Sequence, residues 1–274
     1  MGATASGRAV RASPPQTDGG PCTTWRRALS IVLDTALPSD CLLCGRMSHG
    51  GAALCVRCHA GMIEPAPRRC PRCAAFVASS SSADARRVPL CGRCQTAPPS
   101  YDAAVTLADY ASPYDALILA LKFGRQLAVA NTLGAALAER VAEARDAARL
   151  PPVDCVAAVP LGPRRLFARG FNQSEELARA LARALSLPRR RGLLARQRET
   201  PPQARLTLAE RQRNVQGVFT LSRHARAHDR PAGLHVMLVD DVMTSGATLE
   251  AAARTLKRAG ARAVTLAVAF RTRQ

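Results

Sequence analysis

Two adjacent carboxylates, Asp240 and Asp241, stand directly after an apolar run and shortly before a loop of hydroxyl groups. The run Val236–Val239 has no polar alternation, which is typical of a strand buried on both faces of a parallel sheet. The loop Thr244–Thr248 contains one glycine, and from Leu249 onwards apolar residues recur at helical spacing. We therefore expect these polar groups to lie at the carboxyl end of a parallel sheet, between a strand and a helix.

The loop and the carboxylates suit two different parts of one ligand. Backbone N–H groups at the start of a helix, together with the helix dipole, favour a phosphate. Asp240 and Asp241 lie one strand end away and can accept hydrogen bonds from sugar hydroxyls. A phosphate next to a diol indicates a ribose 5-phosphate. The alternative is an ordinary strand–helix junction whose acids are incidental.

The same stretch resembles the motif of type I phosphoribosyltransferases that binds 5-phosphoribosyl diphosphate (PRPP). That motif has the same order of four apolar residues, two acids and a Thr/Ser-Gly-x-Thr loop. The resemblance implies that Asp240 and Asp241 hold the ribose hydroxyls and that Mg²⁺ bridges these hydroxyls and the diphosphate. It assigns the 5-phosphate to the residues of the loop, Thr244, Ser245, Gly246, Ala247 and Thr248.

A second strand-and-turn unit follows the same plan. Val153–Val159 is an apolar strand candidate, and Pro160–Arg165 forms the turn after it. In type I phosphoribosyltransferases the loop after the first core strand binds the leaving diphosphate. The resemblance places Leu161 and Gly162 in that loop, with Arg164 as its basic catalytic side chain. An ordinary Pro/Gly turn is the alternative.

Eight of the ten cysteines form four Cys-x-x-Cys pairs between residues 41 and 94. Each pair can direct two thiolates at one Zn²⁺, and two pairs complete a tetrahedral site. Sequential pairing gives two consecutive zinc ribbons, while an interleaved pairing stays open. Gly45 and Ala74 follow a cysteine, where a zinc knuckle turns tightly. The expected ligands are Cys41, Cys44, Cys55, Cys58, Cys70, Cys73, Cys91 and Cys94.

Other chemistry of these cysteines is disfavoured. Redox-active pairs or buried free thiols would not require four repeats within so short a stretch. His59 could replace a ligand, but the thiolates already suffice. Cys22 and Cys155 lie outside the pairs, and Cys155 belongs to the apolar run described above, so we expect it in the core.

The composition of the chain limits the classes of partner that the protein is expected to bind. The net charge is +19, and of 39 basic residues only Lys122 and Lys257 are lysines. This bias reflects coding as much as function, yet the charge favours anionic ligands. Aromatic residues make up 4%, which argues against a dedicated base-stacking platform. No apolar run approaches the ~20 residues of a membrane-spanning helix, and the N-terminus lacks a secretory signal, so we expect a cytoplasmic protein.

The chain divides into three predicted regions. Residues 1–38 form a disordered tail and a short amphipathic helix from Trp25 that docks on the body of the protein. Residues 39–99 form the double zinc ribbon. Residues 100–274 form the phosphoribosyltransferase-like domain, an α/β fold with a mainly parallel sheet flanked by helices.

Several further elements are expected in the last region. Tyr101–Tyr110 has strand character and is assigned to a small cap beside the main sheet. Ser112 and Pro113 open a helix that ends at Gly124, a second helix covers 126–149, and Val264–Phe270 is the last core strand. Ser174 is predicted to cap the helix that follows it.

The run Arg169-Gly170-Phe171-Asn172-Gln173, behind a cysteine-rich front, resembles proteins of the ComF family. Further matches are Thr200–Gln203 and the stretch from Arg211 through Asn214 to Phe219. The resemblance covers about Cys41 to Arg271. It implies a double zinc ribbon joined to a phosphoribosyltransferase-like domain. Residues expected to cover the active site are Lys122, Arg169, Asn172, Gln173, Arg211 and Asn214.

For Lys122 two interpretations stay open. A lysine retained in so arginine-biased a chain favours a functional role, but Lys257, at a solvent-facing helix position, weakens that inference.

The family resemblance implies a role in natural competence, in the uptake of transforming single-stranded DNA, with uptake proteins as further partners. Under this hypothesis PRPP and Mg²⁺ bind whether or not the site turns over. The rival hypothesis is an active phosphoribosyltransferase of nucleotide or amine metabolism unrelated to DNA. The residues that would select a nucleobase do not stand out in the sequence.

Overall fold

The computed structural model describes residues 39–49, 51–63, 68–77, 88–147, 149–197, 217–222 and 230–273. In this part of the chain the central sheet has four parallel strands in the order β3-β8-β7-β4. Their bounds are β3 Ala103–Asp109, β4 Cys155–Ala158, β7 His235–Met243 and β8 Ala263–Arg271. The two central strands, β8 and β7, are buried along almost their whole length, because helices cover both of their faces.

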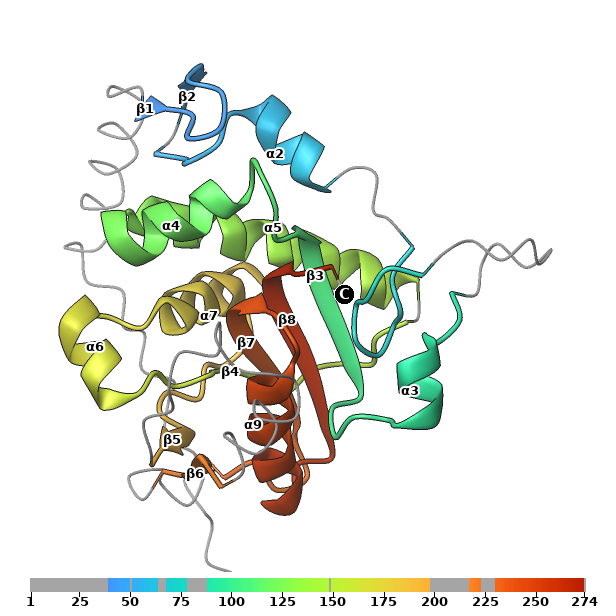
Figure 1. The fold of residues 1–274 in the computed structure, drawn as a ribbon. Coiled ribbons are helices and arrows are strands. Elements are labelled where there is room, and N and C mark those ends of the chain that lie inside the picture. Colours follow the sequence, from blue (N-terminus) through green and yellow to red (C-terminus); the bar gives the residue numbers. More distant parts are fainter. Residues whose placement is uncertain are drawn as a thin grey trace, which may run out of the picture.

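Helices cover both faces of the central sheet (Figure 1), and alternate residues of the central strands belong to two separate cores. Met237 and Val239 pack with helices α4 (Asp115–Gly124), α5 (Leu127–Asp146) and α7 (Gln173–Ala184). Val236 and Leu238 pack on the other face with α9 (Ala247–Arg258). Successive side chains of a strand point to opposite faces, so one strand anchors both layers.

Small residues allow α5 and α7 to approach closely. A Cβ atom on Gly134 of α5 would lie 2.4 Å from the Cβ of Ala180 on α7. The predicted helix over 126–149 is thus confirmed, with its small and apolar face inward. The helical pattern predicted from Leu249 onwards is confirmed as well, since a helix covers Ala247–Arg258, in which Glu250 pairs with Arg254 at 2.8 Å, and Gly260 adopts a positive φ after it.

Four predictions about individual elements were wrong. Tyr101–Tyr110 does not form a cap, because β3 pairs in parallel with β8 and forms one edge of the main sheet. Helix α4 begins at Asp115 behind Tyr114, so Ser112 is not its cap. Strand β7 does not end before the acids but continues to Met243, because β8 is long enough to pair with it. Finally, Asn172 caps α7, and Ser174 lies inside the first turn.

The cysteine-rich region packs against two different sides of this body. The first part has strands β1 (Ser39–Asp40) and β2 (Met47–Ser48) and helix α2 (Val56–Ile63), and lies beside α4 and α5 (Figure 1). Ala53 N donates to Thr132 Oγ1 on α5 at 3.1 Å, and Tyr114 Oη donates to the Gly61 carbonyl at 2.9 Å.

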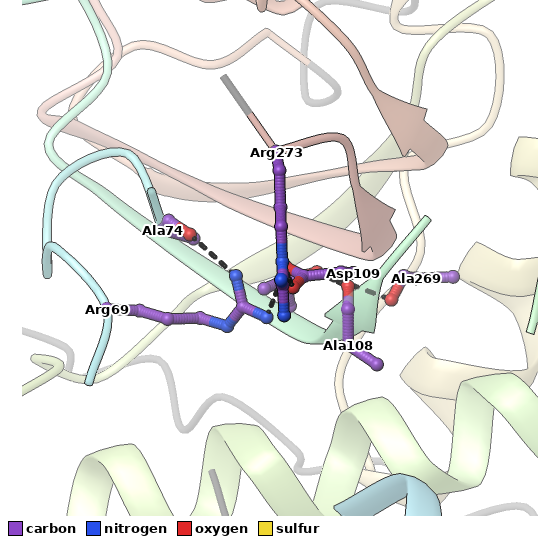
Figure 2. Close-up of polar contacts among 7 residues, drawn as sticks. Arg69, Ala74, Ala108, Asp109, Ala269 and Arg273 are labelled. Atoms are coloured by element: carbon purple, nitrogen blue, oxygen red, sulfur yellow. Dashed lines mark hydrogen bonds and ion pairs between the residues drawn. The ribbon is translucent and has the colours of Figure 1, made fainter. Parts of the chain in front are cut away.

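The second part carries helix α3 (Gly92–Thr96) and packs against β3 and α9. Arg69 from this part donates to Asp109 Oδ1 at 2.7 Å and to the Ala74 carbonyl at 3.1 Å, and Arg273 pairs with the other oxygen of Asp109 at 2.5 Å (Figure 2). One carboxylate therefore joins the cysteine-rich region, the edge strand and the C-terminal segment.

Three smaller elements complete the described chain. Helix α6 (Pro163–Arg169) follows β4, and strands β5 (Leu194–Arg196) and β6 (Phe219–Leu221) form an antiparallel pair. Among the described residues, no helix is both long and apolar enough to cross a membrane. Several sequence predictions fall outside the described residues: the tail and the Trp25 helix within 1–38, the match at Thr200–Gln203, Arg211 and Asn214. The predicted domain boundaries stay predictions.

Candidate functional site

The acidic pair lies near the carboxyl end of β7, where the structure gives each carboxylate a different partner. Ser174 Oγ on α7 donates to Asp240 Oδ1 at 2.7 Å, and Asp241 N donates to the same oxygen at 3.0 Å. Burial of the Asp240 carboxyl group and the negative charge of Asp241 raise the pKa of Asp240 to about 7, although the Ser174 hydrogen bond acts in the opposite direction. Asp240 is thus poised to gain charge when a cation binds nearby.

Asp241 forms an ion pair with Lys122, the lysine for which the sequence left two interpretations open. Lys122 Nζ at the end of α4 lies 2.5 Å from Asp241 Oδ2, and the aspartate side chain is only 7% exposed. Because a buried carboxylate requires a compensating charge, Lys122 is an integral part of this site. Lys257 instead pairs with Asp102 at 2.7 Å, and the Asp102 side chain is far more exposed to solvent than that of Asp241.

Another predicted residue, Arg169, adds positive charge beside Asp241, and Gln173 contacts it. Arg169 at the end of α6 interacts electrostatically with Asp241 and donates to Gln173 Oε1 at 2.6 Å. Its guanidinium also lies 5.8 Å from the centre of the Phe123 ring, which follows Lys122 on α4. The ends of α4, α6 and β7 therefore meet around Asp241.

The predicted phosphate loop connects β7 to α9. Gly246 is the N-cap residue with φ +79°, and a Cβ atom there would lie 2.6 Å from Met243 Cε. Only glycine therefore fits this turn without strain. A small cavity of about 70 Å³ is lined by Asp240, Val242, Met243, Thr244, Gly246, Ala247, Thr248 and Leu249. The predicted loop and Asp240 thus share one cavity, at the N-terminus of a helix that favours an anion.

The second predicted loop starts at the same edge of the sheet, because β4 pairs in parallel with β7. Gly162 is buried and is the N-cap residue of α6, while Leu161 is half-buried and Arg164 is exposed on that helix. Asn172 Nδ2 donates to the Val159 carbonyl at 3.0 Å, and Asn172 Oδ1 accepts from Ser174 N at 3.1 Å. Both ends of the Asn172 amide thus hold α7 against the end of β4.

The cysteines form two groups of four among the described residues, in the sequential pairing. The sulfur atoms of Cys44 and Cys55 lie 3.7 Å apart, and those of Cys73 and Cys91 lie 3.6 Å apart. A tetrahedral zinc ion with Zn–S bonds of ~2.3 Å requires sulfur atoms roughly 3.8 Å apart, so both groups fit Zn²⁺.

The backbone and the neighbouring thiols support the same conclusion. Gly45 and Ala74 both have positive φ, as a zinc knuckle requires. The hydrogen bond from the Cys73 thiol lowers the pKa of Cys70 to about 4, which favours the thiolate, the form that binds metal. His59 faces Glu139 at 3.8 Å, which agrees with four thiolates per site. The protein therefore has two zinc ribbon sites.

Several residues near the site were not recognised from the sequence. Arg93 Nη1 on α3 donates to the Ser245 carbonyl in the phosphate loop at 3.4 Å. Ser100 donates its N–H and its hydroxyl to the two oxygens of Glu250 in the first turn of α9, at 2.8 and 2.6 Å. Local patterns could not reveal these contacts, since about 150 residues separate the partners.

Known protein families match two parts of the chain. Sequence models of two families match it: Double zinc ribbon domain over residues 32–96 and Phosphoribosyl transferase domain over residues 172–274. A phosphoribosyltransferase domain implies a ligand of the ribose phosphate type. Among solved structures, a hypoxanthine phosphoribosyl transferase of Trypanosoma cruzi is 19% identical, with a TM-score of 0.31 over 51% of this chain and 63% of the other.

Three curated relatives carry names that concern DNA or competence. DNA utilization protein YhgH of Salmonella typhi is 35% identical over 83% of this chain and 95% of its own length. The protein of that name in Escherichia coli K12 is 39% identical over 64% of this chain and 74% of its own. Competence protein F of Haemophilus influenzae is 32% identical over 62% and 73%, respectively. This chain therefore belongs to the ComF family, the family of Competence protein F and DNA utilization protein YhgH.

Proposed function

We propose that this protein binds PRPP with Mg²⁺ at the β7–α9 edge and acts in the handling of transforming single-stranded DNA. The main support for this choice of ligand is the cavity in which Asp240 lies beside the N-terminus of α9. The cavity combines an acceptor for sugar hydroxyls with donors for a phosphate, the two groups that PRPP offers side by side.

Each predicted residue has a defined task in this proposal. Asp240 and Asp241 accept from the ribose hydroxyls, and the N–H groups of Thr244–Thr248 bind the 5-phosphate. The turn at Leu161 and Gly162 supplies N–H groups to the diphosphate, and Arg164 supplies positive charge. Oxygen ligands of this kind also suit Mg²⁺, which would neutralise part of the charge of the diphosphate.

Lys122 links ligand binding to the state of Asp241. In the structure its ammonium group neutralises Asp241. A ligand bound at Asp241 would compete with this ion pair, and the ammonium group of Lys122 would then be available to an anionic part of that ligand. The lysine thus compensates the buried acid in the absence of ligand and the anionic ligand in its presence.

Calorimetry with PRPP and Mg²⁺ tests this assignment. We expect Asp240→Asn and Asp241→Asn to weaken binding at least about tenfold, which corresponds to about 1.4 kcal/mol. Asp146→Asn, at the exposed end of α5, is the matched control and should bind as the wild type does. Unchanged affinity in both site variants would contradict the assignment.

A separate observation supports the DNA part of the proposal. Phe123 is 73% exposed and Phe167 is 93% exposed, although such rings are usually buried. Arg164 and Arg165 are also exposed on α6, and Arg169 lies over Phe123. Bases of single-stranded DNA stack on such rings while arginines contact phosphates. We call Phe123, Arg164, Arg165, Phe167 and Arg169 the aromatic–arginine surface.

This surface lies beside the proposed PRPP site, and the names of the relatives favour DNA over a metabolic acceptor. Fluorescence anisotropy with a labelled oligo(dT) tests the role of the rings. Phe167→Leu keeps an apolar side chain but removes the stacking surface, so we expect roughly tenfold weaker binding. Phe76→Leu, exposed in the cysteine-rich region, is the control. Equal affinity of both variants would exclude stacking on Phe167.

A further inference from the structure

The end of β8 holds a buried arginine for which the described residues provide no carboxylate ion pair. Arg271 is 3% exposed, and its Nη1 has no hydrogen-bond partner among the described residues. The acid opposite it in the strand register is Asp109, whose two oxygens already bind Arg69 and Arg273 (Figure 2). A buried guanidinium is costly unless a negative group compensates it, so another source of negative charge is required.

The second cysteine group supplies that charge. Arg271 interacts electrostatically with Cys73, one of its four ligands, and with the buried Tyr101 next to it. A Zn²⁺ ion held by four thiolates leaves two negative charges uncompensated. The zinc centre and the buried guanidinium would therefore carry opposite charges across the boundary between the ribbon and the sheet, and the single guanidinium would offset half of the net charge of the centre.

Arg271 also lies beside the end of β7, from which the phosphate loop begins. Arg271 is paired in register with Met243, and Thr272 N donates to the Met243 carbonyl at 3.0 Å. The Met243 side chain in turn packs under Gly246, so closely that a Cβ atom there would be 2.6 Å from Met243 Cε. A shift of the end of β8 would thus be transmitted to the turn that opens the phosphate site.

The second part of the cysteine-rich region also contacts the phosphate loop and the start of α9 directly. Arg93 precedes the ligand Cys94 on α3 and donates to the Ser245 carbonyl at 3.4 Å. Ser100, just after this ribbon, anchors the first turn of α9 through Glu250. In contrast, within the described chain the first ribbon makes its hydrogen bonds to the body through Thr132, Tyr114 and Arg140, on α5 and next to α4.

We propose that Arg271 is the counter-charge of the second zinc centre and that, with Arg93, it makes zinc at this centre a determinant of the shape of the phosphate loop. Both arginines are positioning residues, since they act on the ligand through Met243 and Ser245. Zinc at the first centre has no such effect. The coupling to a ribose phosphate rests on the proposed function, whereas the pairing of Arg271 with the zinc centre does not.

Matched cysteine variants separate the two centres. Cys94→Ser and Cys58→Ser are each compared with the wild type for zinc content and for PRPP affinity by calorimetry. We expect each variant to lose one zinc ion, but only Cys94→Ser to bind PRPP at least about tenfold more weakly. Equal PRPP affinities of the two variants would overturn the coupling. A wild-type protein that fails to bind PRPP would instead refute the proposed function.

Two further variants leave all eight ligands in place, so that unfolding of a ribbon cannot explain the outcome. Arg93→Ala should retain both zinc ions and weaken PRPP binding severalfold. Arg271→Met should release one zinc ion to a competing chelator at least about tenfold more readily, because the anionic centre loses its counter-charge. Arg140→Met, which loses a contact to the first ribbon, is the control at the other centre. Wild-type zinc retention in Arg271→Met would overturn the pairing, whether or not PRPP binds.

Discussion

Ser174 and Asp240 are joined by a hydrogen bond of 2.7 Å that connects the first turn of α7 to the end of β7. Burial and the charge of Asp241 raise the pKa of Asp240 to about 7, and the donated hydrogen bond limits that rise by stabilising the carboxylate. Ser174 therefore helps to set the charge of Asp240, and it is not the helix cap that its position suggested.

Ser174→Ala should shift the pH dependence of ligand binding. Without the hydroxyl the pKa of Asp240 rises further, so a higher pH is needed to form the carboxylate that would accept hydrogen bonds from the ribose hydroxyls and coordinate Mg²⁺. We expect weaker binding at pH 7 that recovers in part at pH 8.5, measured by calorimetry with PRPP and Mg²⁺. Ser48→Ala, which removes a buried hydroxyl in the first ribbon, is the control. A loss of the same size at both pH values would contradict the electrostatic role.

The two lysines of the chain provide an internal comparison. Lys122→Gln removes the ion-pair partner of the buried Asp241, whereas Lys257→Gln breaks a more exposed pair with Asp102. We expect the free energy of unfolding to fall by about 2–4 kcal/mol in the first variant and by at most about 1 kcal/mol in the second. Urea denaturation at neutral pH measures both. Similar losses would show that Lys122 is an ordinary surface lysine.

The extent of agreement between sequence and structure follows from the range of the contacts. Buried strands and amphipathic helices were predicted because apolar periodicity is local, and the cysteine groups because their pairs are adjacent in the chain. The role of β3 was missed, since its place at the sheet edge depends on pairing with β8, at the other end of the domain. The same holds for Ser174 with Asp240 and for Arg93 with Ser245, whose partners are 66 and 152 residues apart.

The raised pKa of Asp240 predicts a conflict between stability and binding. The folded state holds a proton on Asp240 up to about pH 7, while the unfolded chain releases it near the ordinary value of 3.8. The stabilising contribution is thus complete below about pH 4 and is lost as the pH rises through 7. Asp240→Asn mimics the protonated form, so its free energy of unfolding relative to the wild type should increase from pH 6 to pH 8 by about 1 kcal/mol. Asp146→Asn should show no such trend.

Gly246 and Gly233 separate the cost of a strained backbone from the cost of a filled site. Both have positive φ, +79° and +74°, but at Gly233 no heavy atom of the described chain lies within 4 Å of an added Cβ. Alanine at either position should lower the free energy of unfolding by about 1–2 kcal/mol, because an L-residue is strained there. At Gly246 the added methyl group also meets Met243 Cε and lies in the lining of the phosphate cavity.

Gly246→Ala should therefore lose PRPP affinity at least about tenfold, while Gly233→Ala binds as the wild type does. The contact atom is the end of a flexible side chain, so Met243→Ala should relieve the steric part of the stability loss in the double variant. It should not restore binding, because the methyl group still narrows the cavity and Met243 no longer supports the turn. Full recovery of PRPP affinity in the double variant would contradict this placement of the ligand. It would show that the ligand is insensitive to the methyl group that remains at position 246, and therefore binds elsewhere.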